Sequence, residues 1–240
     1  MSTNTIVTRT AAGFAAALLA CTALPASAAM FMVDFTQLNN SGVAGTGMLD
    51  YDEDGQTLTV TINATGLAEG AHIGHIHGRF DGSGNPIDSV SPSPTADTDG
   101  DGFVEIGEGA VFYGPIILPL SGIGSVDASG ILNYSQTFDL TDASIFGAGF
   151  SASDLLPLSF REIVLHGGPV PLGTGAGTSG ILDGTQGAYV VGLPVASGEI
   201  TAAVPEPATW AMMLLGFFGI GGMMRARRGA VRSLRLGYGF

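Results

Sequence analysis

The sequence predicts an all-β domain, a Greek-key β-sandwich, between two terminal targeting segments. Short runs of β-branched and apolar residues recur between turns rich in Gly, Pro, Asn and Asp. From Thr57 to Ile62 threonine alternates with apolar residues, which is typical of a strand with one buried and one solvated face. The 240 residues are enough to bury a core without disulfides.

The segment 30–203 is expected to consist of short strands joined by Gly- and Pro-rich turns. The Asp54-Gly55 step marks a hairpin, and a short helix is expected over Ser151–Leu156, with Ser151 or Ser153 as its N-cap. The histidine-containing stretch Gly70–Gly78 also has a strand-like pattern. The other predicted strands are Phe31–Leu38, Val43–Tyr51, Gln56–Leu67, Ile116–Leu120, Gly130–Leu140, Arg161–His166, Ala188–Leu193 and Glu199–Ala203.

Residues 1–29 have the features of a secretory signal peptide. Arg9 precedes an apolar run, Ala11–Cys21, and a helix-breaking Pro25. The small residues that follow predict cleavage after Ala28 or Ala29. The mature protein would then be exported and would contain no cysteine, so no disulfide would hold it together.

An alternative interpretation makes Leu18-Leu19-Ala20-Cys21 a lipoprotein cleavage site with an acylated Cys21. Leu19 fits that site poorly, whereas the Ala-Ser-Ala sequence fits ordinary cleavage well. The signal-peptide interpretation is therefore favoured over lipidation.

The C-terminal end begins with Val204-Pro205-Glu206-Pro207 and continues with an apolar run from Ala208 to Met224. Its 17 residues are the lower limit for a membrane-spanning helix. Arg225, Arg227 and Arg228 follow and would hold the end of this helix in the cytoplasm. The simplest interpretation is an ordinary C-terminal anchor.

This segment, 204–228, also resembles the PEP-CTERM sorting signal through its Pro-Glu-Pro tripeptide, Trp210, Gly-rich apolar run and basic end. The resemblance implies a Gram-negative bacterium that makes exopolysaccharide and an exosortase that cuts near Pro205-Glu206-Pro207. It further implies an inner-membrane precursor delivered to the cell envelope or extracellular matrix, with exopolysaccharide or envelope proteins as partners. It indicates where the protein is delivered and implies no activity. Nothing in the sequence explains the tail Gly229–Phe240.

Charge limits the partners of the domain 30–203. The domain has two arginines, Arg79 and Arg161, no lysine and 20 carboxylates, which give a net charge of −18. A field of this sign repels nucleic acid and anionic membrane surfaces. Cations are the expected ligands.

Three of the four histidines lie in Gly70–Gly78. Alternation along a strand puts His75 and His77 on one face, about 7 Å apart. Two imidazoles at this spacing can share a metal ion with a third ligand from another strand, and His166 lies in such a strand. His72 is an odd number of residues from His75, so it faces away and is expected to bond to backbone.

The sequence from Gly66 to His77, Gly-Leu-x-x-Gly-x-His-x-Gly-His-Ile-His, resembles the copper-binding strand of copper–zinc superoxide dismutases. Arg161–His166 is similar to the strand that supplies their last copper histidine. The resemblance implies His75, His77 and His166 as copper ligands and His72 as a structural histidine. With Gly198-Glu199-Ile200, the same stretch also resembles CHRD domains, β-modules found in exported bacterial proteins with this kind of sorting tail.

The departures from the dismutase pattern are large. No histidine lies between His77 and His166, so the bridging and zinc histidines are missing. The domain has no cysteine for the disulfide, and 192–198 lack the arginine that guides superoxide. A three-histidine copper site could still change oxidation state, but the negative domain would slow an anionic substrate.

Three interpretations of the histidines follow. The favoured one is a non-catalytic surface or matrix module that holds copper or zinc, since imidazole suits both metals. A reduced, copper-only dismutase is the enzyme alternative, and a packed, hydrogen-bonded histidine pair without metal is the third. No nucleophile motif of the Gly-x-Ser-x-Gly type is present, so no other catalytic residue is predicted.

Residues 97–108 match the calcium-loop pattern. Five carboxylates in twelve residues repel one another unless a cation neutralises them. Ser91–Pro94 precedes the loop and Gly109 follows it, so we expect a lone calcium loop between strands, with a structural role at about millimolar affinity. A flexible acidic turn is the alternative. The expected ligands are Asp97, Asp99, Asp101, Phe103 through its carbonyl, Glu105 and Glu108.

Overall fold

The computed structural model describes residues 29–175, 181–182, 188–203, 213–222 and 225. Most of the predicted signal peptide (1–28), including Cys21, lies outside the described residues, as does the tail 229–240. The sorting residues outside the described part are Pro205, Glu206, Pro207, Arg227 and Arg228.

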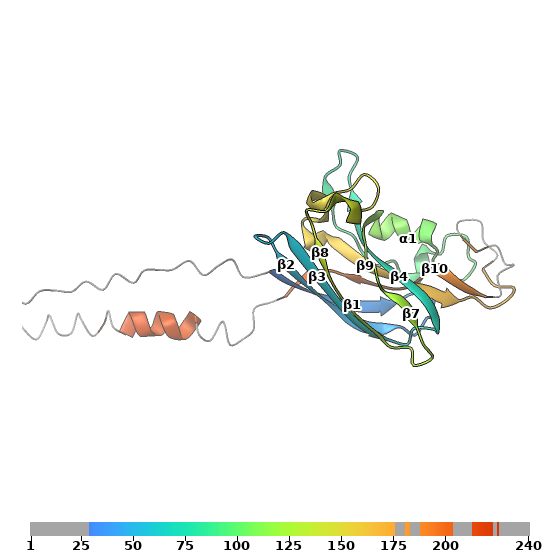
Figure 1. The fold of residues 1–240 in the computed structure, drawn as a ribbon, viewed down its shortest axis with the longest axis horizontal. Helices are drawn as coiled ribbons and strands as arrows, with labels where there is room; N and C mark the ends of the chain where they lie inside the picture. The colour runs from blue at the N-terminus through green and yellow to red at the C-terminus, as the bar shows by residue number, and fades with distance from the viewer. Residues whose placement is uncertain (1–28, 176–180, 183–187, 204–212, 223–224, 226–240) are drawn as a thin grey trace, which may run out of the picture.

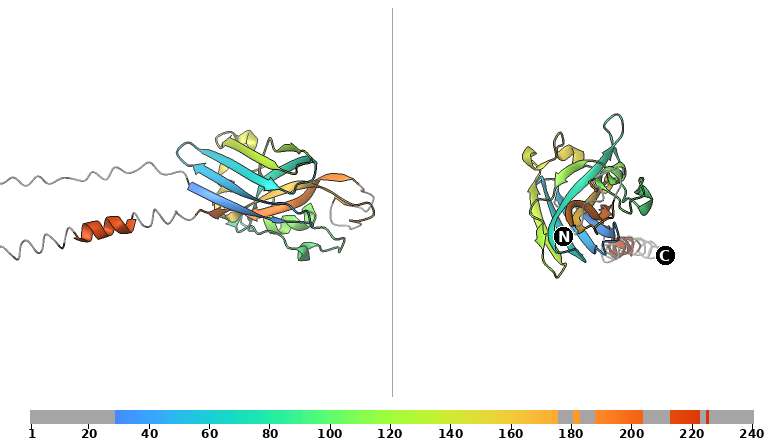
Figure 2. Two further views of the ribbon diagram at one scale, coloured as in Figure 1. Left: turned by 90° about the horizontal axis from the view of Figure 1, so that it is seen from below. Right: turned by 90° about the vertical axis from the view of Figure 1, so that its right-hand side faces the viewer.

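One antiparallel sheet forms the domain and curls so that its two halves face each other (Figures 1 and 2). The strand order is β5-β4-β9-β10-β1-β2-β3-β8; β6 and β7 pair with β4, and β11 pairs with β1. The strands are β1 (Ala29–Gln37), β2 (Ala44–Asp52), β3 (Thr57–Thr65), β4 (Gly70–Phe80), β5 (Pro86–Ile87), β6 (Ile116–Pro119), β7 (Gly124–Val126), β8 (Leu132–Asp139), β9 (Arg161–Pro169), β10 (Tyr189–Glu199) and β11 (Thr201–Ala202).

The alternation in β3 is the one that the sequence predicts. Leu58, Val60 and Ile62 are fully buried. On the solvated face the hydroxyls of Thr59 and Thr61 make cross-strand hydrogen bonds of 2.8 and 3.1 Å to side chains of β8. The strand is therefore stabilised by apolar burial on one side and by polar pairs on the other.

The core lies between the two halves of the sheet. Val33 and Leu49 of β1 and β2 belong to the same buried cluster as Ile76 of β4 and Leu165 of β9. Strand β1 joins the halves because it pairs with β2 along its length and with β10 through Thr36↔Ser197 and Gln37↔Ala196. The mostly-β prediction is confirmed. The predicted two-layer sandwich takes the form of one continuous curled sheet, and the Greek-key and dismutase-like topologies stay predictions.

Strand β10 corrects one sequence expectation. It runs without a break to Glu199, through the segment between the predicted strands Ala188–Leu193 and Glu199–Ala203. Its register against β9 shifts on both sides of Pro194. A bulge accommodates a proline inside a sheet, and this explains why the strand continues where the sequence indicates a stop.

The helices differ from the sequence expectation, and the short strands β5 and β7 were also not expected. The helix expected over Ser151–Leu156 is a single turn of 3-10 helix, Ala152–Leu155, with Ser151 as its N-cap. Helix α1, Ile106–Tyr113, was not expected at all. Glu105 is its N-cap, and the Glu105 and Glu108 side chains form a reciprocal capping box that satisfies backbone N–H groups of the first turn.

Helix α1 lies beside β4 and β10 on the outer face of the sheet (Figure 1). The acidic loop, residues 97–108, therefore runs into a helix that begins at Ile106, contrary to the expectation of a loop between strands. Before the loop there is only the 3-10 turn η1, Pro94–Ala96.

The described part of the C-terminal segment is helical over 213–222, inside the apolar run Ala208–Met224. Among the described residues, no helix has both the length and the apolar character needed to cross a membrane.

Candidate metal centre

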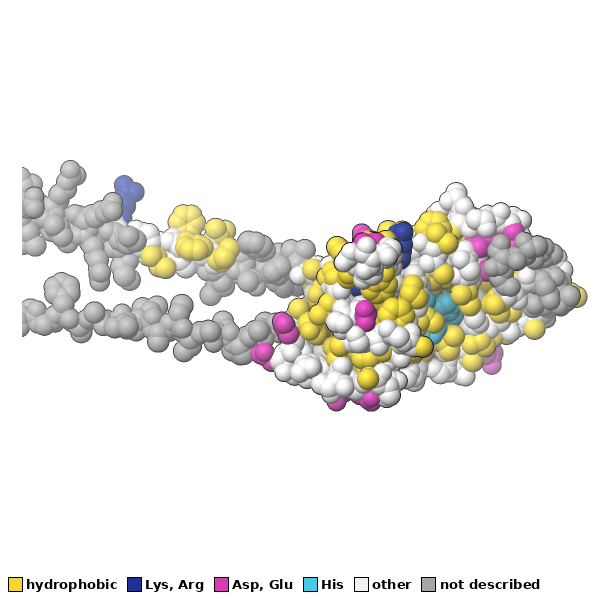
Figure 3. All heavy atoms as spheres, turned by 90° about the horizontal axis from the view of Figure 1, so that it is seen from above, with side chains coloured by type: hydrophobic (Ala, Val, Ile, Leu, Met, Phe, Trp, Pro, Cys, Tyr) yellow, Lys and Arg dark blue, Asp and Glu magenta, His cyan; other side chains and the backbone are white. Residues whose placement is uncertain are grey.

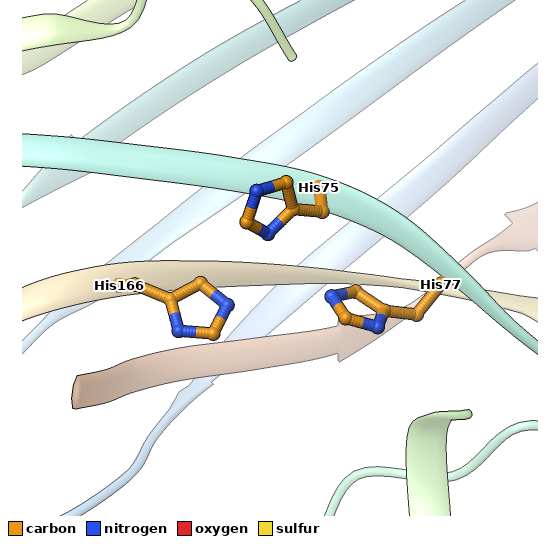
Figure 4. A group of neighbouring side chains, drawn as sticks. All are labelled: His75, His77 and His166. Atoms are coloured by element: carbon orange, nitrogen blue, oxygen red, sulfur yellow. The ribbon is translucent and has the colours of Figure 1, made fainter. Parts of the chain in front are cut away.

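The side chains of His75, His77 and His166 meet on the outer face of neighbouring strands β4 and β9 (Figure 4). The pairing Ile73↔His166 places the third imidazole on β9 within two residues of the position of His75 on β4. One ligand nitrogen from each ring lies within 4.8 Å of the other two. Ring centroids are 5.5 Å apart for His75 and His77 and 5.2 Å apart for His75 and His166.

Backbone carbonyls fix the orientation of two of these rings. His77 donates its Nδ1–H to the carbonyl oxygen of Gly114 at 2.8 Å, and His166 donates its Nδ1–H to that of Gly192 at 2.9 Å. A carbonyl oxygen can only accept, so each ring carries its proton on Nδ1 and leaves a lone pair on Nε2. This is the tautomer that a metal-binding imidazole needs.

Three buried ring nitrogens have no hydrogen-bond partner among the described residues. They are Nδ1 of His75, Nε2 of His77 and Nε2 of His166, one from each ring. Burying an unpaired polar atom costs free energy, so this set fits a bound cation that would accept all three lone pairs.

Burial keeps the three imidazoles neutral. It lowers the pKa of His75 to about 4 and that of His166 to about 4. For His77, burial lowers the pKa to about 3, despite the opposing hydrogen bond to Gly114. At neutral pH the rings therefore keep the lone pairs that a metal requires.

The site is open on one side. His77 and His166 are buried, whereas His75 is partly exposed. Figure 3 shows histidine reaching the surface among hydrophobic side chains. No fourth Cys, His, Asp or Glu of the described residues joins the group. Three protein ligands with an accessible fourth position are typical of a site that exchanges ligands.

Two further side chains lie next to His77 that the sequence analysis did not single out. The Tyr113 ring packs against the His77 ring at 4.6 Å between centroids. Glu162 is the cross-strand partner of His77, is fully buried, and has a pKa raised to about 7, chiefly by burial. Alternation in β9 puts Glu162 on the same face as His166, so its position could have been inferred from the sequence.

His72 lies on the opposite face of β4, away from the group. Its Nε2 is 2.8 Å from the carbonyl oxygen of Ala68, and its Nδ1 is 3.1 Å from that of His166. The hydroxyl of Tyr189 donates to the carbonyl of Ala71 at 2.9 Å and is also 3.0 Å from His72 Nε2. These bonds tie β4 to β9 and β10 behind the candidate metal ligands.

The acidic loop brings its five carboxylates together in two overlapping groups. Ligand oxygens of Asp97, Asp99 and Glu108 lie within 4.8 Å of one another, and so do those of Asp99, Asp101 and Glu105. Asp99 belongs to both groups, so the two groups of carboxylates are adjacent.

Several carboxylates also build the loop. Asp97 accepts hydrogen bonds from the N–H groups of Gly100, Asp101 and Gly102, at 2.7 to 3.1 Å. Glu108 accepts from the N–H and hydroxyl of Thr98. These bonds hold the loop in a tight turn.

The oxygens Asp101 Oδ2 and Glu105 Oε2 are buried without a hydrogen-bond partner among the described residues. Burial, with the charges of neighbouring loop carboxylates, raises the pKa of both groups. Phe103, the predicted carbonyl ligand, packs its side chain against the buried cluster of Val170, Leu182 and Leu193.

The PEP-CTERM protein-sorting motif matches residues 203–228. The match includes Pro205-Glu206-Pro207, the apolar run and the basic residues, among them the described Arg225. No curated protein matches the chain. Membership of the CHRD or dismutase families is not confirmed, and the motif indicates that the chain is an exported protein with exosortase-dependent sorting to the cell surface.

Proposed function

We propose that the chain is an exosortase-sorted module of the cell surface or extracellular matrix that holds one copper or zinc ion at His75, His77 and His166. The observation that supports this most is the set of three buried, unpartnered ring nitrogens, one from each histidine, whose ligand atoms lie within 4.8 Å of one another. The sorting motif supports delivery to the cell surface.

The metal-free alternative, a packed histidine pair, fits the geometry less well. Such a pair would use its ring nitrogens in hydrogen bonds. His77 and His166 instead each bond through Nδ1 to a backbone carbonyl and leave the buried Nε2 without a partner among the described residues. Each unpaired buried nitrogen costs on the order of 1–3 kcal/mol. A bound ion removes this cost for all three.

The donor set favours copper or zinc over hard cations because neutral imidazole suits these metals. Bound there, the ion would supply a Lewis-acidic centre, with redox change in addition for copper. His77 and His166 would be oriented by the carbonyls of Gly114 and Gly192, while the partly exposed His75 would border the open side.

The proposal also includes one structural calcium ion in the acidic loop. The five carboxylates of the acidic loop and the fully buried Glu105 support a calcium ion that neutralises their mutual repulsion and orders residues 97–108. Its role would be structural.

The second candidate function is a copper-dependent, dismutase-like oxidoreductase. The open position beside His75 favours it, because a small reactant could reach the ion there. The charge of the domain opposes it. Arg161, one of its two arginines, is fully buried and donates to the carbonyl of Leu156 at 3.1 Å, so it cannot attract an anion to the site.

Titration of the metal-free chain with zinc and with copper tests the proposal. One equivalent should bind tightly, and His75→Ala combined with His77→Ala should abolish that binding. His72→Ala is the matched control, since it removes a buried histidine outside the group and should leave one equivalent bound. Equal binding by the double variant would contradict the proposal. Superoxide decay measured on the copper-loaded chain separates the two functions, because only the enzyme accelerates it.

A further inference from the structure

We propose that calcium in the acidic loop tightens copper or zinc binding at the histidine site, and that Glu105 transmits the effect through α1 and β10. This inference rests on the proposed function, because it requires both ions. It adds a coupling between the two sites.

Glu105 is the point where the loop joins the rest of the site. Its side chain is fully buried, and its Oε1 accepts a hydrogen bond from the Leu182 N–H. Its Oε2 has no partner in the described part of the chain and belongs to the group formed with Asp99 and Asp101. A buried carboxylate oxygen left open inside an acidic group is placed as a calcium ligand would be.

The first connection runs through α1 to His77. Glu105 caps the start of this eight-residue helix through its capping box with Glu108. The last residue of the helix, Tyr113, packs against the His77 ring, and the carbonyl of its C-cap, Gly114, accepts the His77 Nδ1–H. Helices of this length are marginal without tertiary support, so fixing the cap also fixes the far end.

The second connection runs through β10 to His166. Leu182, held by Glu105, packs in one cluster with Phe103 of the loop and Leu193 of β10. Leu193 follows Gly192, whose carbonyl accepts the His166 Nδ1–H.

Asn39 reinforces this second connection. Its side-chain amide accepts from the Val104 N–H at 2.6 Å and donates to the Val104 carbonyl at 3.0 Å and the Pro194 carbonyl at 2.9 Å. The last part of the acidic loop is thereby bonded to β10 within two residues of Gly192.

The two carbonyls that orient His77 and His166 thus belong to segments that the acidic loop holds. Without a cation, repulsion among five carboxylates loosens the loop and hence the hold on both rings. With calcium bound, the rings are fixed before the second metal arrives, so less ordering has to accompany its binding. Such coupling is reciprocal, so bound zinc also increases the affinity of the acidic loop for calcium.

Long-range electrostatics predicts the opposite sign. Calcium adds positive charge to the domain and would weaken the attraction of a second cation. A tightening of zinc by calcium therefore distinguishes ordering of the site from a general charge effect.

The experiment measures zinc affinity of the full-length chain in detergent micelles by competition with a chromogenic chelator. Calcium-free buffer is compared with saturating calcium and with magnesium at the same concentration. We expect calcium to tighten zinc binding about tenfold, in the usual range for coupled sites. Magnesium should have little effect because it demands a smaller, octahedral site.

The variant Glu105→Gln tests the route, because the amide keeps an oxygen for the Leu182 N–H but loses the charge. Its zinc affinity should be the same with and without calcium, because the calcium effect is lost. Glu53→Gln makes the same change at an exposed position in the β2–β3 hairpin and should retain the effect.

The outcomes are distinct. If both ions bind the wild type but calcium leaves zinc affinity unchanged or weakens it, the coupling is wrong and the proposed function stands. If Glu105→Gln retains the calcium effect, the route through Glu105 is wrong. If zinc does not bind in the absence or presence of calcium, the proposed function fails and the inference fails with it.

Discussion

The ring of Tyr113 lies against the ring of His77, with 4.6 Å between their centroids and 66° between their planes. Tyr113 is the last residue of α1, and the next residue, Gly114, accepts the Nδ1–H of the same histidine. One helix end thus fixes both the position and the tautomer of a candidate ligand. The properties of the site should therefore depend on residues that carry no metal-binding group.

Gly114→Ala tests this dependence. Gly114 has a φ of +83°, and a Cβ there would collide with the carbonyl oxygen of Gly78. We expect a loss of about 2–4 kcal/mol in unfolding free energy from strain and overpacking. Zinc affinity should fall as well, because the carbonyl that orients His77 moves. Chemical denaturation and zinc competition measure the two effects.

Gly84→Ala is the matched control. Gly84 has a similar φ of +82°, but its added Cβ would meet no atom within 4 Å. The variant should lose only about 1 kcal/mol of unfolding free energy through backbone strain and should keep the zinc affinity of the wild type. Unchanged zinc affinity in Gly114→Ala, at a concentration where the variant is folded, would contradict the role of this carbonyl.

The pH dependence of the unfolding free energy should reflect the ionisation of Glu162. Its folded-state pKa of about 7 is raised from the ordinary 4.5, mainly by burial. Between pH 4.5 and about pH 7, the folded state therefore binds more protons than the unfolded state. The contribution of protonated Glu162 to stability is present below about pH 4.5 and is lost as the pH rises to about 7.

Glu162→Gln removes this titration. The metal-free variant should be more stable than the wild type at pH 8, by on the order of 2–3 kcal/mol, and the difference should shrink toward pH 4.5. Denaturation at several pH values measures it, with exposed Glu53→Gln as the control for charge. A difference that stays constant from pH 4.5 to 8 would show that Glu162 ionises normally.

Calcium should raise the melting temperature of the chain. At about 100 times the dissociation constant, the gain is about 2.7 kcal/mol, which corresponds to about 5–10 °C for a domain of this size. Asp97→Ala should remove the calcium-dependent gain. Asp127→Ala should lose basal stability but retain the gain, since Asp127 makes similar turn hydrogen bonds outside the loop. The loop assignment is wrong if calcium leaves the wild-type melting temperature unchanged.

The sorting motif makes a prediction about location. Changing Pro205, Glu206 and Pro207 together to alanine should prevent exosortase processing, so the chain should accumulate uncut in the membrane fraction. Cell fractionation and the intact mass of the product measure this. As a control, the histidine double variant should be sorted normally. Normal processing of the tripeptide variant would mean that the sorting step does not use this motif.

The sequence was sufficient for the parts of the site that depend on side-chain type and strand alternation. It placed His75 and His77 on one face of a strand and proposed His166 from a second strand, and the structure brings these three together. It could not reveal the hydrogen-bond acceptors on Gly114 and Gly192, because every residue has a carbonyl and only the fold selects which one meets a ring.

Other elements were missed because tertiary structure overrides local signals. Helix α1 contains Gly107 and Gly109, which have low helix propensity, and forms nonetheless with the Glu105–Glu108 capping box and packing on the sheet. Strand β10 continues past Pro194 because a bulge accommodates the proline. Neither the cap partner nor the bulge can be read from composition.

The most direct test of the account is the metal content of the chain purified from its own host without chelators. The account predicts about one equivalent of copper or zinc per chain, and loss of that metal in the His75→Ala, His77→Ala double variant. A wild-type chain without either metal, or a double variant with the same metal content, would contradict it.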